Sequence, residues 1–237
     1  MAVERAFEAG ADEVIVVDGG SDDGTLAVAE GTRCITHQSR RGRAVQQNAG
    51  AQLATGDVLL FLHADCYLQR DAISQIRERL DDTSIDGGAF RQKIEADGFL
   101  YRWLERGNVW RVRFLRLPYG DQGIFIRREV FQELGRFPDV PLMEDLLLMR
   151  RFRRRHRGVL LPGPLHVDAR RWKTNGVIRQ TARNWALLTA QRLGISLEKL
   201  AHFYPPNAEI ADREESVTTE KSLDSESDQR RRSDILT

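Results

Sequence analysis

The sequence is short of several residue types, and each shortage excludes a class of protein. Two cysteines in 237 residues are too few for a disulfide scaffold and indicate a reducing compartment. No apolar run approaches the roughly 18–20 residues of a membrane-spanning helix. The first residues resemble neither a signal peptide nor a transit peptide, so we expect a cytoplasmic protein.

An excess of one charge is also absent, because 36 Lys and Arg stand against 35 Asp and Glu, for a net charge of +1. This balance argues against nucleic acid as a partner. Residues 208–237 nevertheless hold nine acidic and five basic residues and few large apolar ones. Such a segment buries too little to offset its ordering entropy. We expect one folded domain over 1–206 and a disordered charged tail over 207–237.

Short β-branched runs alternate with longer helical patterns along the expected domain. This alternation is typical of an α/β protein with a mostly parallel sheet flanked by helices. Strands are expected at Glu13–Val17, Arg33–Thr36, Val58–Leu62, Gly87–Ile94 and Gly123–Arg127. Helices are expected at Asp71–Leu80, Phe99–Leu117, Arg128–Leu134, Glu144–Arg155, Thr174–Leu193 and Ser196–Phe203.

An aromatic stripe runs along the expected helix Phe99–Leu117, where large apolar residues recur at helical spacings: Phe99, Leu100, Trp103, Leu104, Val109, Trp110 and Phe114. Large apolar side chains are mostly buried, so we expect the stripe to face the core. A binding groove for an apolar acceptor is the alternative.

A glycine-rich turn follows the first expected strand, in the sequence Val16-Val17-Asp18-Gly19-Gly20-Ser21. Ligands of open α/β sheets bind at the carboxyl ends of strands. Glycines let a ligand approach the backbone, and a carboxylate at the strand end can accept hydrogen bonds from a ribose or a base. An ordinary tight turn with a helix N-cap is the alternative reading.

A histidine and a carboxylate, His63 and Asp65, follow the apolar strand at Val58–Leu62. Being two residues apart at a strand end, they point the same way. Such a pair could hold Mg²⁺ or Mn²⁺ against a diphosphate, because these ions complete their coordination with phosphate oxygens and water. A capping or turn role is the simpler interpretation.

Adjacent carboxylates, Glu144 and Asp145, open the expected helix Glu144–Arg155. Acidic side chains at a helix N-terminus are favoured by the helix dipole in any case. In a cleft, however, one of them could serve as a general base for a hydroxyl nucleophile.

Arginine is the dominant basic residue, at 32 residues against four lysines. A cluster spans Arg150–Arg157, and the sequence Arg170-Arg171-Trp172 follows. Guanidinium groups bind phosphate oxygens bidentately. A solvated basic face is the simplest reading of the cluster. A more specific interpretation is that the cluster makes peripheral contact with the inner face of a membrane.

Five stretches in this order resemble glycosyltransferase family 2, and more narrowly the radical-SAM/selenodomain-associated transferase 2 subgroup. They are VDGGSDDGT, GRAVQQNAGAQLATGDVLLFLHAD, PYGDQGIF, PLMEDLLLMRRFRRR and ARRW. The resemblance implies a GT-A fold and inverting transfer of a sugar from a nucleoside diphosphate donor to a hydroxyl acceptor.

The resemblance also implies roles for individual residues. Asp145, with Glu144 beside it, would be the catalytic base, and Asp65 would be the last position of an Asp-x-Asp motif that binds a divalent metal ion, Mg²⁺ or Mn²⁺. His63 stands at the first position of that motif, and His166 is a candidate extra ligand. The expected donor-binding residues are Asp18, Gly19, Gly20, Gly42, Arg43, Asn48, Asp65, Arg171 and Trp172.

The family normally opens with a strand and a helix, but residues 1–10 of this sequence match only the end of that helix. Because the opening strand is central in a GT-A sheet, its absence should leave neighbouring strands with unpaired backbone groups. Either the start of the coding sequence is placed too late, or this product is a destabilised, inactive variant. Two alternatives to an active transferase stay open: an inactive, truncated relic that binds a sugar nucleotide, motivated by the absent strand, and a basic adaptor for a membrane surface or RNA, motivated by the Arg150–Arg157 cluster.

Overall fold

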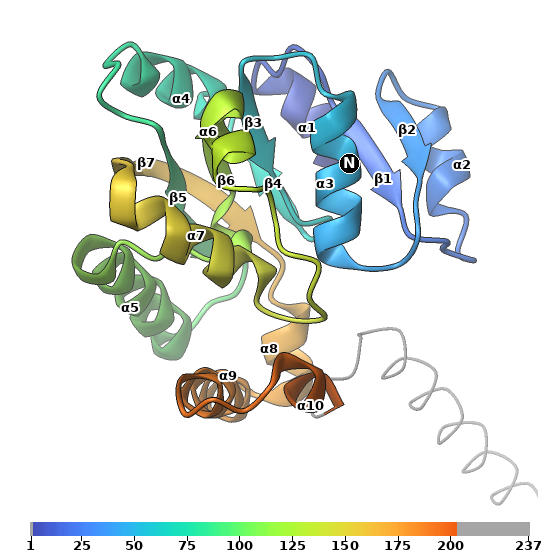
Figure 1. Cartoon of the computed structure of the whole chain (residues 1–237). Coiled ribbons are helices and arrows are strands. Elements are labelled where there is room, and N and C mark those ends of the chain that lie inside the picture. The colour runs from blue at the N-terminus through green and yellow to red at the C-terminus, as the bar shows by residue number, and fades with distance from the viewer. Residues whose placement is uncertain (1, 203–237) are drawn as a thin grey trace, which may run out of the picture. The chain divides into compact units, whose positions relative to one another are not determined.

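The computed structural model of the protein describes residues 2–202, apart from the side chain of Arg171. The described residues divide into two compact units, which meet between residues 189 and 190 of the sequence. Figure 1 shows the elements of the structure. The helices are α1 (Ala2–Glu8), α2 (Thr25–Glu30), α3 (Arg43–Leu53), α4 (Ala72–Leu80), α5 (Phe99–Leu115), α6 (Arg128–Glu133), α7 (Glu144–Arg155), α8 (Arg170–Asn175), α9 (Val177–Arg192) and α10 (Leu197–His202), with a 3₁₀ turn at Gly120–Gln122. The strands are β1 (Ile15–Asp18), β2 (Ile35–Gln38), β3 (Val58–Phe61), β4 (Cys66–Leu68), β5 (Gly87–Ile94), β6 (Ile124–Arg127) and β7 (Gly158–Val167).

The strands form two sheets, and the larger one is mixed. Strands β1 and β2 pair in parallel. The other five follow the order β3-β6-β5-β7-β4, in which only β5 and β7 run parallel and the remaining neighbours are antiparallel. The α/β class is confirmed, but the prediction of a mostly parallel sheet is wrong in that detail, because β6 runs antiparallel to both β3 and β5, and β4 runs antiparallel to β7.

The sheet is interrupted between β1 and β3. Within residues 2–202, β1 pairs only with β2 and β3 pairs only with β6. This gap is what the absence of the family's opening strand predicts. Helix α3 packs on β1 beside the gap and lies on the viewer's side of the strands in Figure 1.

Strands β4 and β7 were not expected from the sequence. Strand β7 contains Pro162 and Pro164, which normally argue against an interior strand because proline cannot donate to the ladder. The strand tolerates them at an irregularity, where its register with β5 shifts between Phe90 and Gln92. Strand β4 has only three residues and follows the His63–Asp65 turn.

The core lies between the larger sheet and its helices. Phe90, Phe125 and Leu165 are fully buried, and the Phe90 and Phe125 rings are 5.9 Å apart between centroids. Side chains from α1, β4, α4 and β7 complete the same apolar cluster. Cys34 and Cys66 are both free cysteines. Among residues 2–202, no helix has the length and apolarity needed to cross a bilayer.

The aromatic stripe of α5 does not face the core. Phe99, Trp103, Trp110 and Phe114 are 58–73% exposed, and Val112 is the one buried residue of this helix. The core-face prediction is therefore wrong. Helical spacing shows which side chains share a face, but not whether that face meets the sheet.

The boundary expected at residue 206 and the tail expected over 207–237 lie outside the described residues.

Replacing Phe90 by Ala should lower the free energy of unfolding by about 3–5 kcal/mol, because it leaves a cavity in the core. Phe114→Ala is the matched control: its ring is 68% exposed, so its effect should stay within about 0.5 kcal/mol. Urea unfolding of both variants measures the difference, and equal losses would contradict this assignment of the core.

Candidate active site

The turn after β1 is organised by the carboxylate of Asp18. Its Oδ2 accepts the backbone N–H groups of Gly20 and Ser21 at 2.8 and 2.9 Å, and its Oδ1 accepts the Ser21 hydroxyl at 2.5 Å. These bonds, above all the one from the Ser21 hydroxyl, lower the pKa of Asp18. The carboxylate is therefore ionised and fixed at the carboxyl end of the strand.

The segment before α3 packs against this turn. A Cβ at Gly19 would lie 3.3 Å from the Cα of Arg41 and 3.0 Å from Nε2 of Gln46, so a larger residue would push the two segments apart. Gln46 also donates to the carbonyl of Val17 at 3.1 Å. Gly42, at φ 141°, precedes the helix. The predicted Gly42–Arg43 segment thus lies beside the Asp18 turn.

A buried ion pair joins this region to α7. Arg43 Nε lies 3.0 Å from Oε1 of Glu144, and its Nη2 donates to Oε2 at 3.1 Å. Glu144 is 1% exposed. Burial raises the pKa of Glu144, the neighbouring Asp145 charge adds to that rise, and Arg43 opposes it. The pair fixes the start of α7 against the start of α3.

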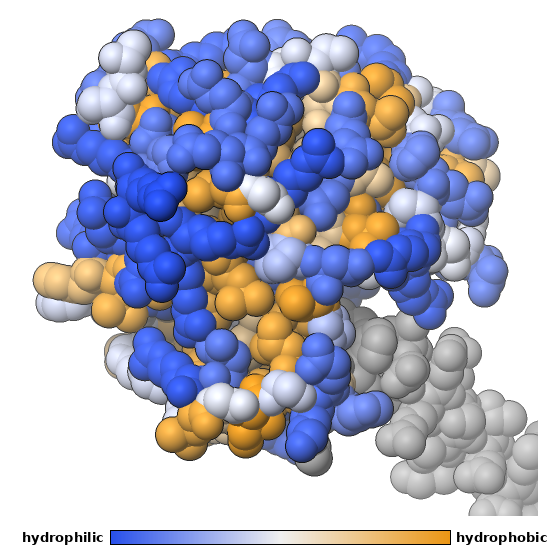
Figure 2. Space-filling view, viewed as in Figure 1, coloured by the Kyte–Doolittle hydropathy of each residue, from blue (hydrophilic) through white to orange (hydrophobic). Residues whose placement is uncertain are grey.

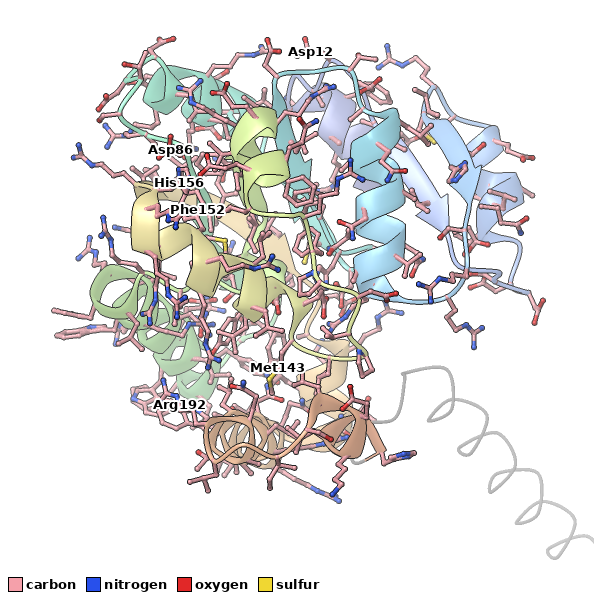
Figure 3. All side chains as sticks on the ribbon, viewed as in Figure 1. Asp12, Asp86, Met143, Phe152, His156 and Arg192 are labelled. Atoms are coloured by element: carbon pink, nitrogen blue, oxygen red, sulfur yellow. The ribbon has the colours of Figure 1, made fainter. Side chains whose placement is uncertain are left out.

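The turn before α7 presents Asp145 to the 3₁₀ turn. Met143 precedes the helix with a left-handed backbone, φ 64°, a conformation that is costly for a non-glycine residue and is common at functional sites. It is labelled in Figure 3. Oδ2 of Asp145 then accepts the N–H of Gly120 at 2.6 Å. A Cβ at Gly120 would lie 2.5 Å from Nε2 of His63.

His63, Gly120 and Asp145 therefore meet at one point, although they come from three distant parts of the sequence. The same hypothetical Cβ would lie 3.3 Å from Oδ2 of Asp145, so the histidine and the carboxylate flank the glycine closely. Only a glycine fits here, because any side chain would displace the His63 ring.

Two further carboxylates, Asp65 and Asp121, lie near the thiol of Cys66. Burial is the main cause that raises the pKa of Cys66, and the charges of Asp65 and Asp121 add to the rise. Oδ1 of Asp121 is buried and has no hydrogen-bond partner within the described residues. An unsatisfied buried carboxylate oxygen is of the type that a hard divalent cation prefers as a ligand.

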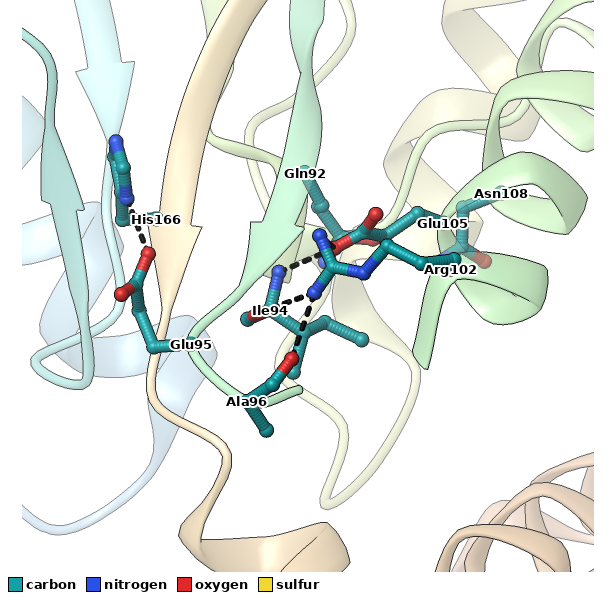
Figure 4. Close-up of polar contacts among 8 residues, drawn as sticks. All are labelled: Gln92, Ile94, Glu95, Ala96, Arg102, Glu105, Asn108 and His166. Atoms are coloured by element: carbon teal, nitrogen blue, oxygen red, sulfur yellow. Dashed lines mark hydrogen bonds and ion pairs between the residues drawn. The ribbon is translucent and has the colours of Figure 1, made fainter. Parts of the chain in front are cut away.

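His166 has other partners. Its Nδ1 lies 2.5 Å from Oε1 of Glu95, as Figure 4 shows, and its ring stacks on Tyr67 with centroids 4.8 Å apart. Hydrogen bonding to His166 lowers the pKa of Glu95. Across residues 2–202, no three His, Cys, Asp or Glu side chains are grouped to hold a metal ion. A three-ligand set with His63, Asp65 and His166 is thus not formed.

Two other predicted donor-binding residues are engaged in packing. Asn48 donates to the carbonyl of Phe137 at 2.9 Å and accepts its N–H at 3.1 Å, which ties α3 to the loop before α7. Trp172 packs against the core cluster. The side chain of Arg171 is outside the described residues, so its role stays a prediction.

The sequence analysis assigned no role to the 3₁₀ turn at Gly120–Gln122, although it quoted the stretch PYGDQGIF. Gln122 is fully buried and accepts from Arg111 at 2.5 Å. The guanidinium of Arg111 also lies 3.4 Å from the centroid of the Tyr119 ring. The Gly-Asp-Gln sequence directly before an expected strand was the feature that could have indicated this turn.

The arrangement has an ionised carboxylate after β1, carboxylates beyond β3, and a carboxylate at the start of α7. Residues 2–135 match the family model described as Glycosyl transferase family 2. The chain belongs to this family. The family match ends before Glu144 and Asp145, so the candidate base is located by the structure and the sequence motif alone.

Relatives and solved structures agree with the family assignment. The PGL/p-HBAD biosynthesis glycosyltransferase of Mycobacterium bovis BCG is 32% identical over 131 residues, covering 52% of this chain and 50% of that protein. An uncharacterised protein of Mycobacterium tuberculosis is 27% identical over 116 residues, covering 47% of this chain and 36% of that protein. This family 2 chain thus spans half or less of the length of these relatives.

Two solved glycosyltransferases share the fold. The mannosyltransferase PcManGT from Pyrobaculum calidifontis, in complex with GDP-Man and Mn²⁺, has a TM-score of 0.57 at 21% identity, over 81% of this chain and 56% of that one. TarS 1–349 of S. aureus, in complex with UDP-GlcNAc, has a TM-score of 0.56 at 18% identity, over 71% and 54%. The fold is of the GT-A type.

Replacing Arg43 by Ala should destabilise the protein, because it leaves the buried Glu144 carboxylate without its charge partner. Breaking a buried pair costs about 3–5 kcal/mol. We expect a value near the lower end, because the Arg43 side chain is 42% exposed. The variant raises the folded-state pKa of Glu144 further above its unfolded value of about 4.3. The folded state then binds the proton more tightly, so the loss of stability grows as the pH rises above that value.

Urea unfolding at pH 5 and pH 8 measures this effect, with Glu144→Gln as the control. The Gln variant keeps the shape and removes the charge, so its loss should be smaller and should not increase with pH. An Arg43→Ala loss that is the same at both pH values would contradict the assignment.

Proposed function

We propose that the chain transfers a sugar from a nucleoside diphosphate donor to a hydroxyl acceptor, with inversion at the anomeric carbon. The observation that carries the proposal is the meeting of His63, Gly120 and Asp145, one residue away from the Arg43–Glu144 pair. Through that pair the candidate base is linked to the Asp18 turn. The fold neighbours described with GDP-Man and UDP-GlcNAc support a nucleotide-sugar donor.

Donor binding falls to the Asp18 turn and the start of α3. An ionised carboxylate whose oxygens are fixed by Gly20 and Ser21 can accept hydrogen bonds from a ribose or a base. A Cβ at Gly20 would have no atom within 4 Å, so the backbone is open to a ligand there, whereas Gly19 lets the segment before α3 pack closely on the turn. The guanidinium of Arg43 binds the Glu144 carboxylate. In this proposal Arg43 therefore positions α7 and does not bind phosphate directly.

A divalent cation, Mg²⁺ or Mn²⁺, fits beside Asp65, with the unsatisfied Oδ1 of Asp121 as a second oxygen. When bound, such an ion neutralises the negative charge that develops on the departing diphosphate. His63 flanks Gly120 at this point.

Asp145 removes the proton of the acceptor hydroxyl. Its two oxygens accept backbone N–H groups from Gly120 at 2.6 Å and Leu146 at 2.7 Å. These bonds fix the plane of the carboxylate, and each oxygen retains a lone pair for the acceptor. A base fixed in this way does not have to reorganise when the hydroxyl attacks.

A non-catalytic sugar-nucleotide-binding protein is the second candidate. The interruption between β1 and β3 favours it, because the half that carries Asp18 is separated in the sheet from the half that carries Asp65. The two candidates differ in turnover and agree in donor binding.

Asp145→Asn should lower the transfer rate about 10²- to 10⁴-fold, the usual contribution of a general base, and leave donor affinity unchanged. The Asn side chain can still accept the Gly120 N–H, so the fold is retained. Turnover and calorimetric affinity with UDP-GlcNAc and GDP-mannose separate the two effects.

Asp97→Asn is the matched control, because Asp97 is an exposed carboxylate away from the Gly120 turn. It should leave both quantities unchanged. A wild-type chain that binds donor without any turnover would favour the non-catalytic candidate, and near-normal transfer by Asp145→Asn would refute the base.

Asp65→Asn should abolish the stabilisation that Mn²⁺ adds in the presence of UDP or GDP. For the unmodified chain, the ion at a hundred times its Kd should raise the thermal midpoint by about 5–10 °C. Thermal unfolding with and without Mn²⁺ measures this independently of turnover. A full Mn²⁺ effect in the variant would remove Asp65 from the ion's ligands.

A further inference from the structure

The outer side of α5 is apolar where a soluble helix is normally polar. Phe99, Trp103, Trp110 and Phe114 are separated by four, seven and four residues, a spacing that places them on one face. They are 73%, 58%, 63% and 68% exposed, respectively. We call these four residues the aromatic ridge. The rings of Trp110 and Phe114 stack with centroids 4.8 Å apart, so part of the ridge is already ordered.

Arginines border the ridge. Arg106 and Arg113 come from α5 itself and are exposed, and Arg116 ends the helix. Arg153 of α7 donates to the carbonyl of Leu115 at 2.7 Å, which joins the Arg150–Arg157 cluster to the same side of the molecule. Figure 2 shows apolar side chains protruding over α5, next to strongly polar surface over α7.

A cavity of about 310 Å³ opens between α5 and α7. Its floor is apolar, with Val112, Met149 and Phe152 among the lining residues. Its polar lining is entirely basic, and no acidic residue lines it: the basic residues are Arg79, Arg113, Arg116, Arg153 and His156. Figure 3 labels Phe152 and His156 at this end of α7, beside Asp86.

Four arginines, two in the cavity lining and two at the end of α7, have no partner of opposite charge. Within residues 2–202, the guanidinium groups of Arg113 and Arg116, which line the cavity, and of Arg154 and Arg155, which follow Arg153 in α7, make no hydrogen bond or ion pair. His156 differs, because Asp86 and Glu133 lie 3.3 and 3.6 Å from its ring nitrogens. The unpaired arginines leave a concentrated positive field beside the aromatic ridge.

We propose that this face docks on an anionic lipid bilayer. The aromatic ridge enters the interfacial region, and the arginine-lined cavity receives lipid phosphate groups. Indole and phenyl rings on one side of a helix, with arginines beside them, suit the membrane interface, because the rings partition into the headgroup region and the arginines attract anionic lipids. The unpaired arginines beside the ridge give this face the charge complementary to an anionic bilayer. The proposal stands independently of the glycosyltransferase activity.

Vesicle binding by the full chain tests the proposal. We compare phosphatidylcholine vesicles with vesicles that also contain phosphatidylglycerol, by co-sedimentation and by quenching of tryptophan fluorescence with brominated lipid. The unmodified chain should bind the anionic vesicles at least tenfold more tightly. Added salt should weaken that binding, and millimolar glycerol phosphate should not release it, since the bilayer and not the free headgroup is the ligand.

Two sets of substitutions separate the ridge from the charges. Trp103→Ser with Trp110→Ser and Phe114→Ser should weaken binding at least tenfold and abolish the quenching assigned to the ridge. Arg113→Gln with Arg116→Gln and Arg154→Gln should remove the preference for anionic lipid. All six side chains are exposed, so both variants should keep the thermal midpoint and donor affinity of the parent.

Matched controls carry the same kinds of change elsewhere on the surface. Val28→Ser with Ile35→Ser removes exposed apolar groups, at 54% and 44% exposure, and Arg70→Gln with Arg91→Gln removes exposed charges. Both should bind vesicles as the parent does. Three results would overturn the proposal: no binding to anionic vesicles, equal losses in ridge variant and control, or a ridge that instead mediates self-association or RNA binding without vesicle binding.

Discussion

The bidentate contact between Arg43 and Glu144 is the interaction on which the candidate active site depends. It is buried on the Glu144 side and joins two helix starts that are 101 residues apart in sequence. Because Glu144 is held, the next residue, Asp145, can accept the Gly120 N–H. The Arg43 side of the same pair fixes the segment that packs on the Asp18 turn. One ion pair thus holds the Asp18 turn and the candidate base at a fixed distance from each other.

The Arg43–Glu144 pair is needed to hold the Asp18 turn in place because, within residues 2–202, no sheet connects β1 with β3. Strands β1 and β3 belong to different sheets, so no ladder of backbone hydrogen bonds holds the Asp18 turn in place relative to Asp65. Side-chain contacts replace the ladder. Asn48 binds both backbone groups of Phe137, and Gln46 binds the carbonyl of Val17. Helix α3 carries all of these contacts and serves as the connection between the halves.

Local chemistry in the sequence predicted much of this, and long-range pairing limited the rest. The helix Glu144–Arg155 has the expected bounds, since its acidic start and basic end match the helix dipole. Strand β7 was missed because Pro162 and Pro164 are tolerated only through an irregular register with β5. The burial of α5 was misjudged because a helical period does not reveal which face meets a sheet. The unpaired Oδ1 of Asp121 could not be predicted, because it depends on which segments surround Cys66.

Helix α5 connects the membrane proposal to the chemistry. Its outward side carries the aromatic ridge, while Arg111 on the same helix binds Gln122 and lies over Tyr119, on either side of Gly120. A helix with its side chains is about 10 Å across. A bilayer seated on the ridge would therefore lie roughly one helix diameter from the turn that Asp145 contacts. An acceptor hydroxyl attached to a lipid would have to extend by about that distance to reach the base, whereas a hydroxyl at the lipid surface itself would stop short of it.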